Sequence, residues 1–184
     1  VSNEDLLLKF KKLSKMLEAK IKEGKIKHYG IASWNGFLYE EGGLEYLSLA
    51  DFVAASKEYG DGFRFIQVPY NLAKPHPYIY ANQKIDDKYY TAISAAMKLG
   101  LNVIGSSSLL QMNLFKRGFS TAFRDVCNLS LASDLQRALQ FTRSNPSILS
   151  ALVGASSIEH VEHDFAIMGE AIVDSKNYEN FFRL

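Results

Sequence analysis

The sequence predicts an α/β fold in which parallel strands alternate with helices, and two observations support this. Runs of β-branched and aromatic residues near positions 26, 64, 102 and 150 are separated by segments with helical periodicity. Polar side chains also collect where each of these four runs ends. Strands that alternate with helices form parallel sheets with right-handed crossovers. The pattern fits an open doubly wound sheet, or part of an eight-stranded barrel that needs about 250 residues when complete.

The first two strand-to-helix units follow an amino-terminal helix. Apolar residues recur at helical spacing over residues 2–23, and Gly24 ends this helix. A strand is predicted over residues 25–32, followed by a helix within residues 44–59 that starts near Ser48. Residues 63–68 form the second predicted strand because they are rich in aromatic and β-branched side chains.

The middle of the chain is predicted as a long loop followed by a third unit. Residues 70–84 contain two of the four prolines and are expected to form the loop. A helix is expected to start at Asp86 or Asp87 and to run to Gly100. The third strand follows over residues 101–105.

Residues 109–128 carry weak signals, and only a short helix around Gln111 is predicted there. Beyond them, Ser133 with Gln136 three residues later opens a helix. This helix must stop before Pro146, because the residue that precedes a proline disfavours helical geometry.

A strand near position 150 leads directly into the last predicted helix. The strand stops at Gly154, and Ser156 with Glu159 three residues later predicts a capping box. Such a junction directs free N–H groups and the positive end of the helix dipole at one point, which suits a phosphate. The alternative is that Ser156 and Glu159 satisfy these donors themselves. Residues 165–184 are expected to continue helically.

Composition and charge exclude several classes of protein. The 184 residues are 47% hydrophobic and 22% charged, which is typical of a globular domain, and we expect one domain over residues 1–184. The net charge of +1 favours neither a nucleic-acid partner nor an anionic membrane surface. Cys127 is the single cysteine, so no internal disulfide forms, and a reducing cytoplasm is the simplest location. No apolar run is long enough to span a membrane, and the first residues lack a signal pattern. Because the sequence begins with Val1, we expect a processed chain or part of a longer one.

Four segments together resemble the aldo-keto reductases. Residues 29–37 (YGIASWNGF) are similar to the run at the end of the family's fifth strand, and residues 65–72 (FIQVPYNL) to its sixth strand. Residues 106–111 (SSSLLQ) resemble the end of the seventh strand. The eighth strand and its flanks are matched by residues 137–146, 151–154 and 159–164. The resemblance implies that the chain is the carboxyl-terminal half, strands five to eight, of a TIM-type (β/α)8 barrel.

The resemblance further implies a site for NADP(H), with NAD(H) as the alternative, at the carboxyl ends of these strands. The family's cofactor-binding positions are occupied here by Ser33, Gln67, Ser106, Ser107, Leu109, Gly154, Ala155, Ser156, Ser157, His160 and Asp164. The first two match residues that bond the nicotinamide carboxamide. Ser106 stands where many members stack a tyrosine on the nicotinamide ring, and Ser107 and Leu109 match the turn on the pyrophosphate side.

The remaining matches concern the adenine side of the cofactor. Residues 154–157 match the junction that binds phosphate. Asp164 lies where the family has an asparagine that meets the adenine, and His160 where an arginine often binds the 2′-phosphate. A neutral histidine is a weaker phosphate partner than arginine, so the choice between NADPH and NADH stays open.

The resemblance implies hydride transfer between the cofactor and an aldehyde or ketone, but it assigns no catalytic residue to this chain. The family's catalytic Asp, Tyr, Lys and His come from strands one to four, which precede the matched segments. We therefore expect this chain alone to be inactive, and to self-associate or to combine with a complementing half-barrel that completes the site for a small carbonyl substrate. The alternatives are a non-catalytic nucleotide-sensing module that binds a partner, and an inert truncated fragment.

Two histidine-containing patterns carry weaker signals. His160, His163 and Asp164 are three and four residues apart and share one helix face, but an exposed face is the commoner cause of such a pattern, so no metal site is predicted. His76 lies between two prolines in the loop after the second strand. It is either a substrate contact or a loop residue without a role.

Overall fold

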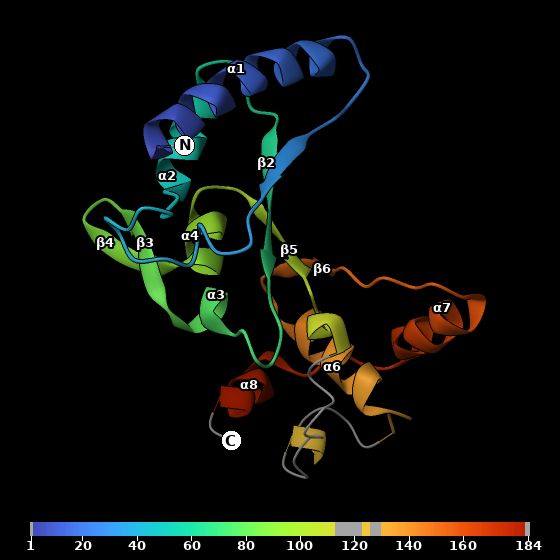
Figure 1. Ribbon diagram of the computed structural model, residues 1–184. Helices are drawn as coiled ribbons and strands as arrows, with labels where there is room; N and C mark the ends of the chain where they lie inside the picture. Colours follow the sequence, from blue (N-terminus) through green and yellow to red (C-terminus); the bar gives the residue numbers. More distant parts are fainter. Residues whose placement is uncertain (1, 113–122, 126–129, 183–184) are drawn as a thin grey trace. The chain divides into compact units, whose positions relative to one another are not determined.

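The computed structural model describes residues 2–112, 123–125 and 130–182 of the chain (Figure 1). Its contacts divide the chain into two compact units. The first unit comprises Val1–Pro69 and His76–Ile104, and the second comprises Tyr70–Pro75 and Gly105–Leu184.

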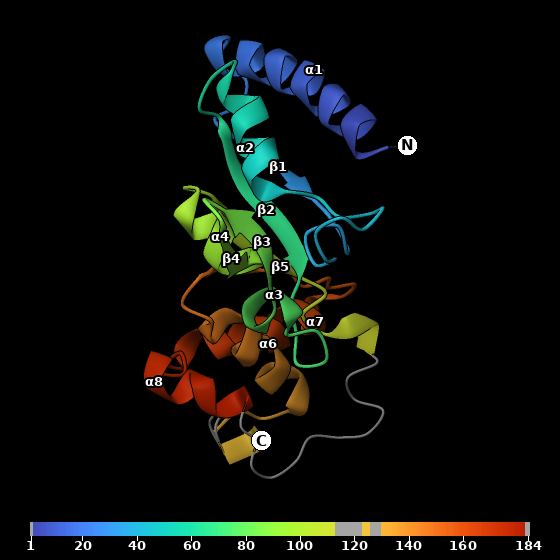
Figure 2. The same ribbon diagram turned by 90° about the vertical axis from the view of Figure 1, so that its left-hand side faces the viewer.

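The first unit begins with the long helix α1 (Asn3–Lys22), as predicted. The Ser2 hydroxyl accepts a hydrogen bond from the Asp5 amide, and the Asp5 carboxylate accepts one from the Ser2 amide, which forms a capping box. Phe10 packs edge-on against Phe52 of α2 (Leu49–Lys57), with 4.7 Å between the ring centroids. Figure 2 shows α1 lying alongside α2, so these helices form one side of the unit.

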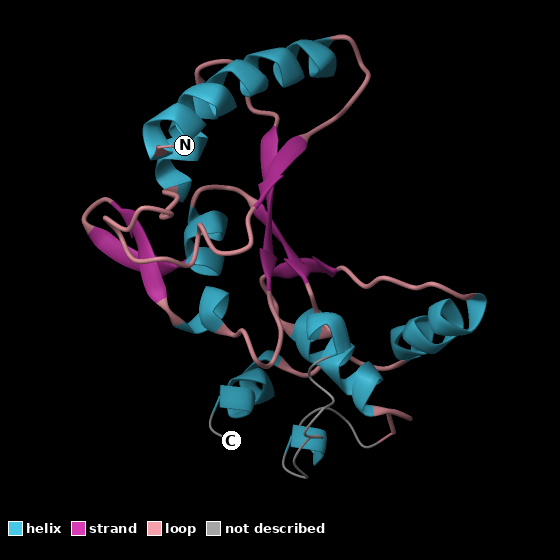
Figure 3. Cartoon of the chain, in the orientation of Figure 1, coloured by secondary structure: helices cyan, strands magenta, loops and turns pink. Residues whose placement is uncertain are grey.

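Parallel strands form the sheet, which confirms the predicted α/β class (Figure 3). In the first unit β1 (Tyr29–Ala32) pairs in parallel with β2 (Phe63–Pro69), and β2 is followed in the sheet by β5 (Asn102–Ser106). In the second unit β6 (Ile148–Ala151) lies beside the end of β5. The predicted strand over residues 25–32 is shortened to its second half, because pairing with β2 begins only at Tyr29.

After β2 the chain forms an antiparallel hairpin that was not predicted from the sequence. The chain passes from β2 through α3 (His76–Ile79) into β3 (Ala81–Ile85), which pairs with β4 (Lys88–Thr91). The prediction of a loop to residue 84 and of a helix from Asp86 was wrong. Asp86 and Asp87 have φ values of 49° and 62°, and two consecutive left-handed residues make a tight two-residue hairpin turn.

The helix that follows this hairpin, α4 (Ala92–Lys98), therefore starts later than predicted. Thr91 caps it by accepting a hydrogen bond from the Ser94 amide. Its buried residues Ala92, Ile93, Ala95 and Ala96 belong to the core of the first unit, together with Ile66 and Val68 of β2.

The second unit is built around α6 (Asp134–Ser144), whose cap Ser133 accepts from the Gln136 amide as predicted. Phe141 of α6 stacks between Tyr70 and Tyr178, with 5.4 Å between ring centroids on each side. The prediction of continuous helix over residues 165–184 was wrong. Short elements replace it, namely α7 (Ile158–Phe165), η2 (Ala166–Gly169), α8 (Ser175–Tyr178) and η3 (Glu179–Phe182).

The segment after β5 is only partly described. The short helix predicted around Gln111 is a single turn over residues 110–112, and all three residues have left-handed φ values between 46° and 64°. Cys127 and most of residues 109–128 lie outside the described residues. No helix of the described part is both long and apolar enough to cross a membrane.

Candidate cofactor site at the strand ends

In the first unit, Ser33 and Gln67 lie side by side at the carboxyl ends of neighbouring strands. The Ser33 amide donates to the Gln67 carbonyl oxygen over 3.1 Å, and the Ser33 hydroxyl accepts from the Gly36 amide over 2.9 Å. Both residues are half-buried. The side-chain amide of Gln67 has no hydrogen-bond partner among the described residues. An amide in this state has both its donors and its acceptor available for a ligand such as a carboxamide.

The loop that starts at Ser33 is braced by the hairpin that the sequence reading missed. The buried Gln83 of β3 donates to the carbonyl oxygens of Phe37 and Leu47, both over 3.1 Å, and accepts from the Leu49 amide. Asn82 donates to the Phe37 carbonyl oxygen as well, over 2.9 Å. Two buried amides therefore hold the backbone that follows β1.

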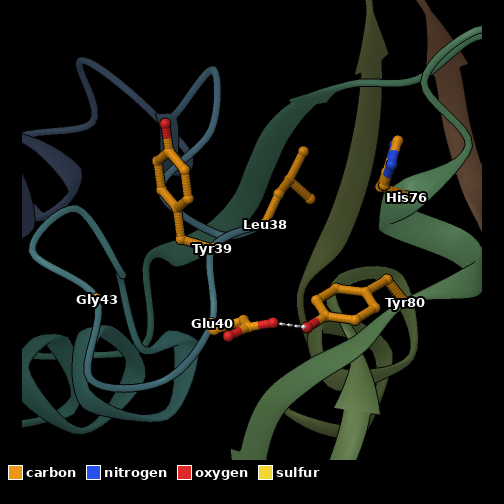
Figure 4. Close-up of a pocket in the computed structure, with 6 residues that line it drawn as sticks. All are labelled: Leu38, Tyr39, Glu40, Gly43, His76 and Tyr80. Atoms are coloured by element: carbon orange, nitrogen blue, oxygen red, sulfur yellow. Dashed lines mark hydrogen bonds between the residues drawn. The ribbon is translucent and has the colours of Figure 1, made fainter.

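A pocket of about 630 Å³ opens between this loop and α3 (Figure 4). It is lined by Leu38, Tyr39, Glu40, Gly43, His76 and Tyr80. The Tyr80 hydroxyl donates to the Glu40 carboxylate over 2.7 Å, and this bond raises the pKa of Tyr80 above its usual value. Since the loop follows β1 and α3 follows β2, the pocket lies at the carboxyl ends of these strands. His76 thus lines a pocket on the side where barrel enzymes hold their substrates.

In the second unit, Ser106, Ser107 and Leu109 form a tight turn at the end of β5. Ser107 has a left-handed φ of 55°, and its carbonyl oxygen accepts from the Leu110 amide over 2.8 Å. Leu109 is half-buried against the apolar cluster of Leu131, Leu139 and Ile167. Packing of Leu109 therefore fixes the position of the turn that carries Ser106 and Ser107.

The junction after β6 differs in one respect from its prediction. Ser157, not Ser156, caps α7, because its hydroxyl accepts from the His160 amide over 3.2 Å. Glu159 accepts from its own backbone amide and from Ser157, and these bonds lower the pKa of its carboxyl. The predicted capping box between Ser156 and Glu159 was therefore wrong. Serines at two consecutive positions make either one an acceptable cap, and the sequence does not discriminate between them.

Gly154 and its neighbours leave room for a ligand. A Cβ atom added at Gly154 would meet no described atom within 4 Å, and residues 154–156 are exposed. The Ser156 hydroxyl lies 3.2 Å from Nδ1 of His160, so these two side chains are neighbours. Free backbone next to a helix amino terminus, with hydroxyl and imidazole groups beside it, is a donor set that fits a phosphate. The residues present therefore fit the phosphate-bearing side of a dinucleotide.

Asp164 differs from the exposed residues 154–156 in its burial. It is buried, and Nδ1 of His163 lies 3.5 Å from its carboxylate. With Val153, Ala151 and Phe165 it lines a largely apolar cavity of about 470 Å³. A flat apolar base can occupy such a cavity, with the polar residues Arg143, Ser150 and Asp164 at its wall.

Contacts within the second unit bring the serine turn and the junction together. The Ser108 hydroxyl donates to the Leu152 carbonyl oxygen over 3.2 Å, and the Leu152 amide donates to the Gly105 carbonyl oxygen over 2.8 Å. The two segments assigned to phosphate contacts are thus neighbours, while Ser33 and Gln67 form a separate pair in the first unit.

Sequence reasoning missed the buried residues that support these groups. Asn71, which is 0% exposed, was not among the predicted site residues, and no supporting role was predicted for Ser108, which is 1% exposed. An asparagine three residues before the Lys74-Pro75 pair is typical of an Asx turn, and this signal was available for Asn71. Within the described part of the chain, no group of three or more His, Cys, Asp or Glu side chains can hold a metal ion.

Comparisons with known proteins agree on the fold. No family model and no curated protein matches the sequence. The chain has a parallel β/α fold, and it resembles solved structures of aldo-keto reductases. An aldo/keto reductase from Klebsiella pneumoniae in complex with NADP and acetate is 20% identical, with a TM-score of 0.64 over 95% of this chain and 53% of its own.

Two further structures give the same result. An aldo-keto reductase from Klebsiella pneumoniae in complex with NADPH is 22% identical, with a TM-score of 0.60 over 90% of this chain and 50% of its own. A thermostable aldo-keto reductase in complex with the inhibitor epalrestat is 14% identical, with a TM-score of 0.64 over 94% and 53%. The chain spans about half the length of these structures and shares their fold over that half.

Proposed function

We propose that this chain is the cofactor-binding half of an oxidoreductase of the aldo-keto reductase type, with NADP(H) as the cofactor. The observation that carries the proposal is the open Gly154 junction beside the serine turn, at the carboxyl ends of β6 and β5. The likeness to enzymes solved with NADP and NADPH supports the choice of a nicotinamide dinucleotide. NAD(H) is the alternative, because His160 stands where an arginine would favour the 2′-phosphate.

Each group has a defined task in this proposal. Gln67 and Ser33 bond the carboxamide and so orient one face of the nicotinamide ring. Ser106 and Ser107 contact the pyrophosphate side, and residues 154–157 hold the adenine-side phosphates with backbone N–H groups. When bound, the cofactor supplies the hydride that reduces a carbonyl carbon. The carbonyl compound also needs a proton at its oxygen, and we assign no donor for it within these residues.

We propose that a second half-barrel completes the protein, contributed by a complementing segment or by self-association. The apolar surface of the second unit supports this, since Leu149, Phe165, Met168 and Ile172 are each more than half exposed. Exposed apolar side chains gathered in one region are typical of a surface that contacts another chain. The Figure 4 pocket with His76 is the proposed place for part of the substrate.

Titration of NADPH and NADH into the pure chain tests the cofactor assignment, with light scattering to record its association state. We expect saturable binding of NADPH and no reduction of aldehydes or ketones by the chain alone. Turnover by the pure chain, abolished by mutation of one of its own tyrosines, would show that a proton donor lies within it. Absence of binding by a well-folded chain, alone and with an added half-barrel, would leave the inert fragment as the better description.

A further inference from the structure

Asn71 is a fully buried polar residue that touches the serine turn. Its side-chain Nδ2 donates to the Ser107 carbonyl oxygen over 2.8 Å. Its Oδ1 accepts from the amides of Ala73 and Lys74, over 2.9 Å and 3.0 Å, in an Asx turn. Every polar atom of the Asn71 carboxamide is thus engaged, with one end fixed by its own loop and the other end fixed to the turn.

Ser107 needs such a partner because of its backbone conformation. Its φ of 55° lies in the left-handed region, which costs about 1 kcal/mol or more for a residue with a Cβ atom. Its carbonyl oxygen accepts from the Leu110 amide on one side and from Asn71 on the other. The second bond comes from outside the turn and selects the conformation in which the carbonyl oxygen points at Asn71.

Tyr70 anchors the loop from which Asn71 projects. Its amide donates to the Ser106 carbonyl oxygen over 2.9 Å, and its hydroxyl lies 2.7 Å from the hydroxyl of Tyr178. Asn145 donates to the Tyr70 hydroxyl over 3.0 Å. The loop therefore connects the serine turn to buried groups of α6 and α8.

We propose that Asn71 is a positioning residue for the cofactor, which acts by holding Ser107 in its left-handed conformation. The proposal rests on the proposed function for its effect on NADP(H), whereas its effect on the turn stands by itself. Asn71 does not reach the ligand in this account. It fixes the direction of the backbone and hydroxyl groups of Ser106 and Ser107 that do.

The test is Asn71→Asp, with Gln140→Glu as the matched control. Aspartate keeps the oxygen that accepts from Ala73 and Lys74 but cannot donate to the Ser107 carbonyl oxygen. Gln140 is equally buried in the same unit and donates to the Ala171 carbonyl oxygen over 2.6 Å, away from the turn. We expect Asn71→Asp to weaken NADPH binding at least tenfold and Gln140→Glu to change it less than twofold, at similar losses of thermal stability. Equal NADPH affinity in Asn71→Asp and in the unchanged chain would overturn the proposal.

Hydrogen exchange separates this inference from the proposed function. Without cofactor, the Leu110 amide should exchange at least tenfold faster in Asn71→Asp and at its usual rate in Gln140→Glu. If the chain binds no NADPH but this difference is seen, the proposed function fails and the positioning of the turn stands. Unchanged exchange of Leu110 would refute the positioning role whether or not the cofactor binds. If Asn71→Asp does not fold, Asn71→Ser removes the same long-range bond without adding charge, and the same two measurements decide.

Discussion

The polar groups at the strand ends differ between the two units in their hydrogen-bond partners and their exposure. In the first unit, buried amides of Asn82 and Gln83 donate to carbonyl oxygens of the loop after β1, whereas the half-buried Gln67 side chain has no partner among the described residues. In the second unit, the serine turn is held by Asn71, but residues 154–156 are exposed around an open Gly154. Buried polar groups with hydrogen-bond partners support the fold, whereas exposed polar groups are available to water or to a ligand, so the comparison divides the residues into these two kinds.

Burial of the strands shows a second difference. Ile66 and Val68 of β2 are 0% exposed, because helices cover that face of the first unit. In β6 only Ile148 is buried, and Leu149 is 62% exposed. A parallel strand is normally covered on both faces, so β6 has the features of a strand that lacks its neighbours.

The largest expected effect is the difference in the free energy of unfolding between variants of Gln83, whose side-chain amide has hydrogen-bond partners, and of Gln67, whose amide has none among the described residues. Gln83→Ala should cost about 3 kcal/mol in the free energy of unfolding, because it removes the buried partner of the Leu47 carbonyl oxygen and of the Leu49 amide and opens a cavity. Gln67→Ala, the control, removes a half-buried amide without a described partner and should cost less than about 1 kcal/mol. Urea denaturation measures both. Equal losses would mean that Gln67 has a structural partner after all.

The next effect concerns the open junction of the second unit. Gly154→Val should weaken NADPH binding at least tenfold, because a side chain would fill the space next to the backbone N–H groups. The free energy of unfolding should change by less than about 0.5 kcal/mol, since the added atoms meet nothing in the chain and φ is not left-handed. Calorimetric titration and denaturation measure the two quantities.

Glu159→Gln is the companion variant for this junction. It removes a carboxylate from the helix start and should leave NADPH binding unchanged or slightly tighter. NADPH affinity that is the same in Gly154→Val and in the unchanged chain would remove this junction from the site.

A smaller effect is expected for association. Leu149→Glu places a charge on the exposed apolar surface of the second unit and should weaken self-association at least tenfold. Leu8→Glu, a matched change at a residue of α1 that is 54% exposed, should leave association unchanged. Sedimentation at several concentrations measures this. A chain that is monomeric at micromolar concentration before any substitution would contradict the proposed completion by a second half.

The comparison also explains which elements the sequence could predict. Ser2, Ser48 and Ser133 each precede a long amphipathic segment, and each caps a helix where it was expected. Asp86 and Asp87 were misinterpreted, because aspartate suits both a helix cap and a left-handed turn. Pairing of β3 with β4 settles the choice, and sequence spacing alone does not contain that information.

For the candidate site, the sequence could predict which strand-end residues lie next to one another, but not the residues that support them. Strand order places Ser33 beside Gln67, and the serine turn beside the junction, since the ends of neighbouring parallel strands meet at one edge. Support by Asn71 and Gln83 was not predictable from periodicity, because these bonds join residues 34 to 46 positions apart.

The smallest effect tests how the second unit responds to acid. Arg124 donates two hydrogen bonds to Asp134, and these bonds, with further attraction from Arg124 and Arg137, lower the pKa of the Asp134 carboxyl. A carboxyl with a lowered folded-state pKa stabilises the fold above its unfolded pKa of about 3.9, and this stabilisation is lost as the pH falls through the folded value. Asp134→Asn should therefore cost about 1 kcal/mol at pH 7, and the difference from the unchanged chain should shrink as the pH falls below about 4. Glu58→Gln, which removes the exposed Lys11–Glu58 pair of the first unit, should leave urea unfolding unchanged at pH 7 and at pH 3. A difference that does not shrink at all between pH 7 and pH 3 would mean that Asp134 acts through packing at the start of α6 and not through its charge.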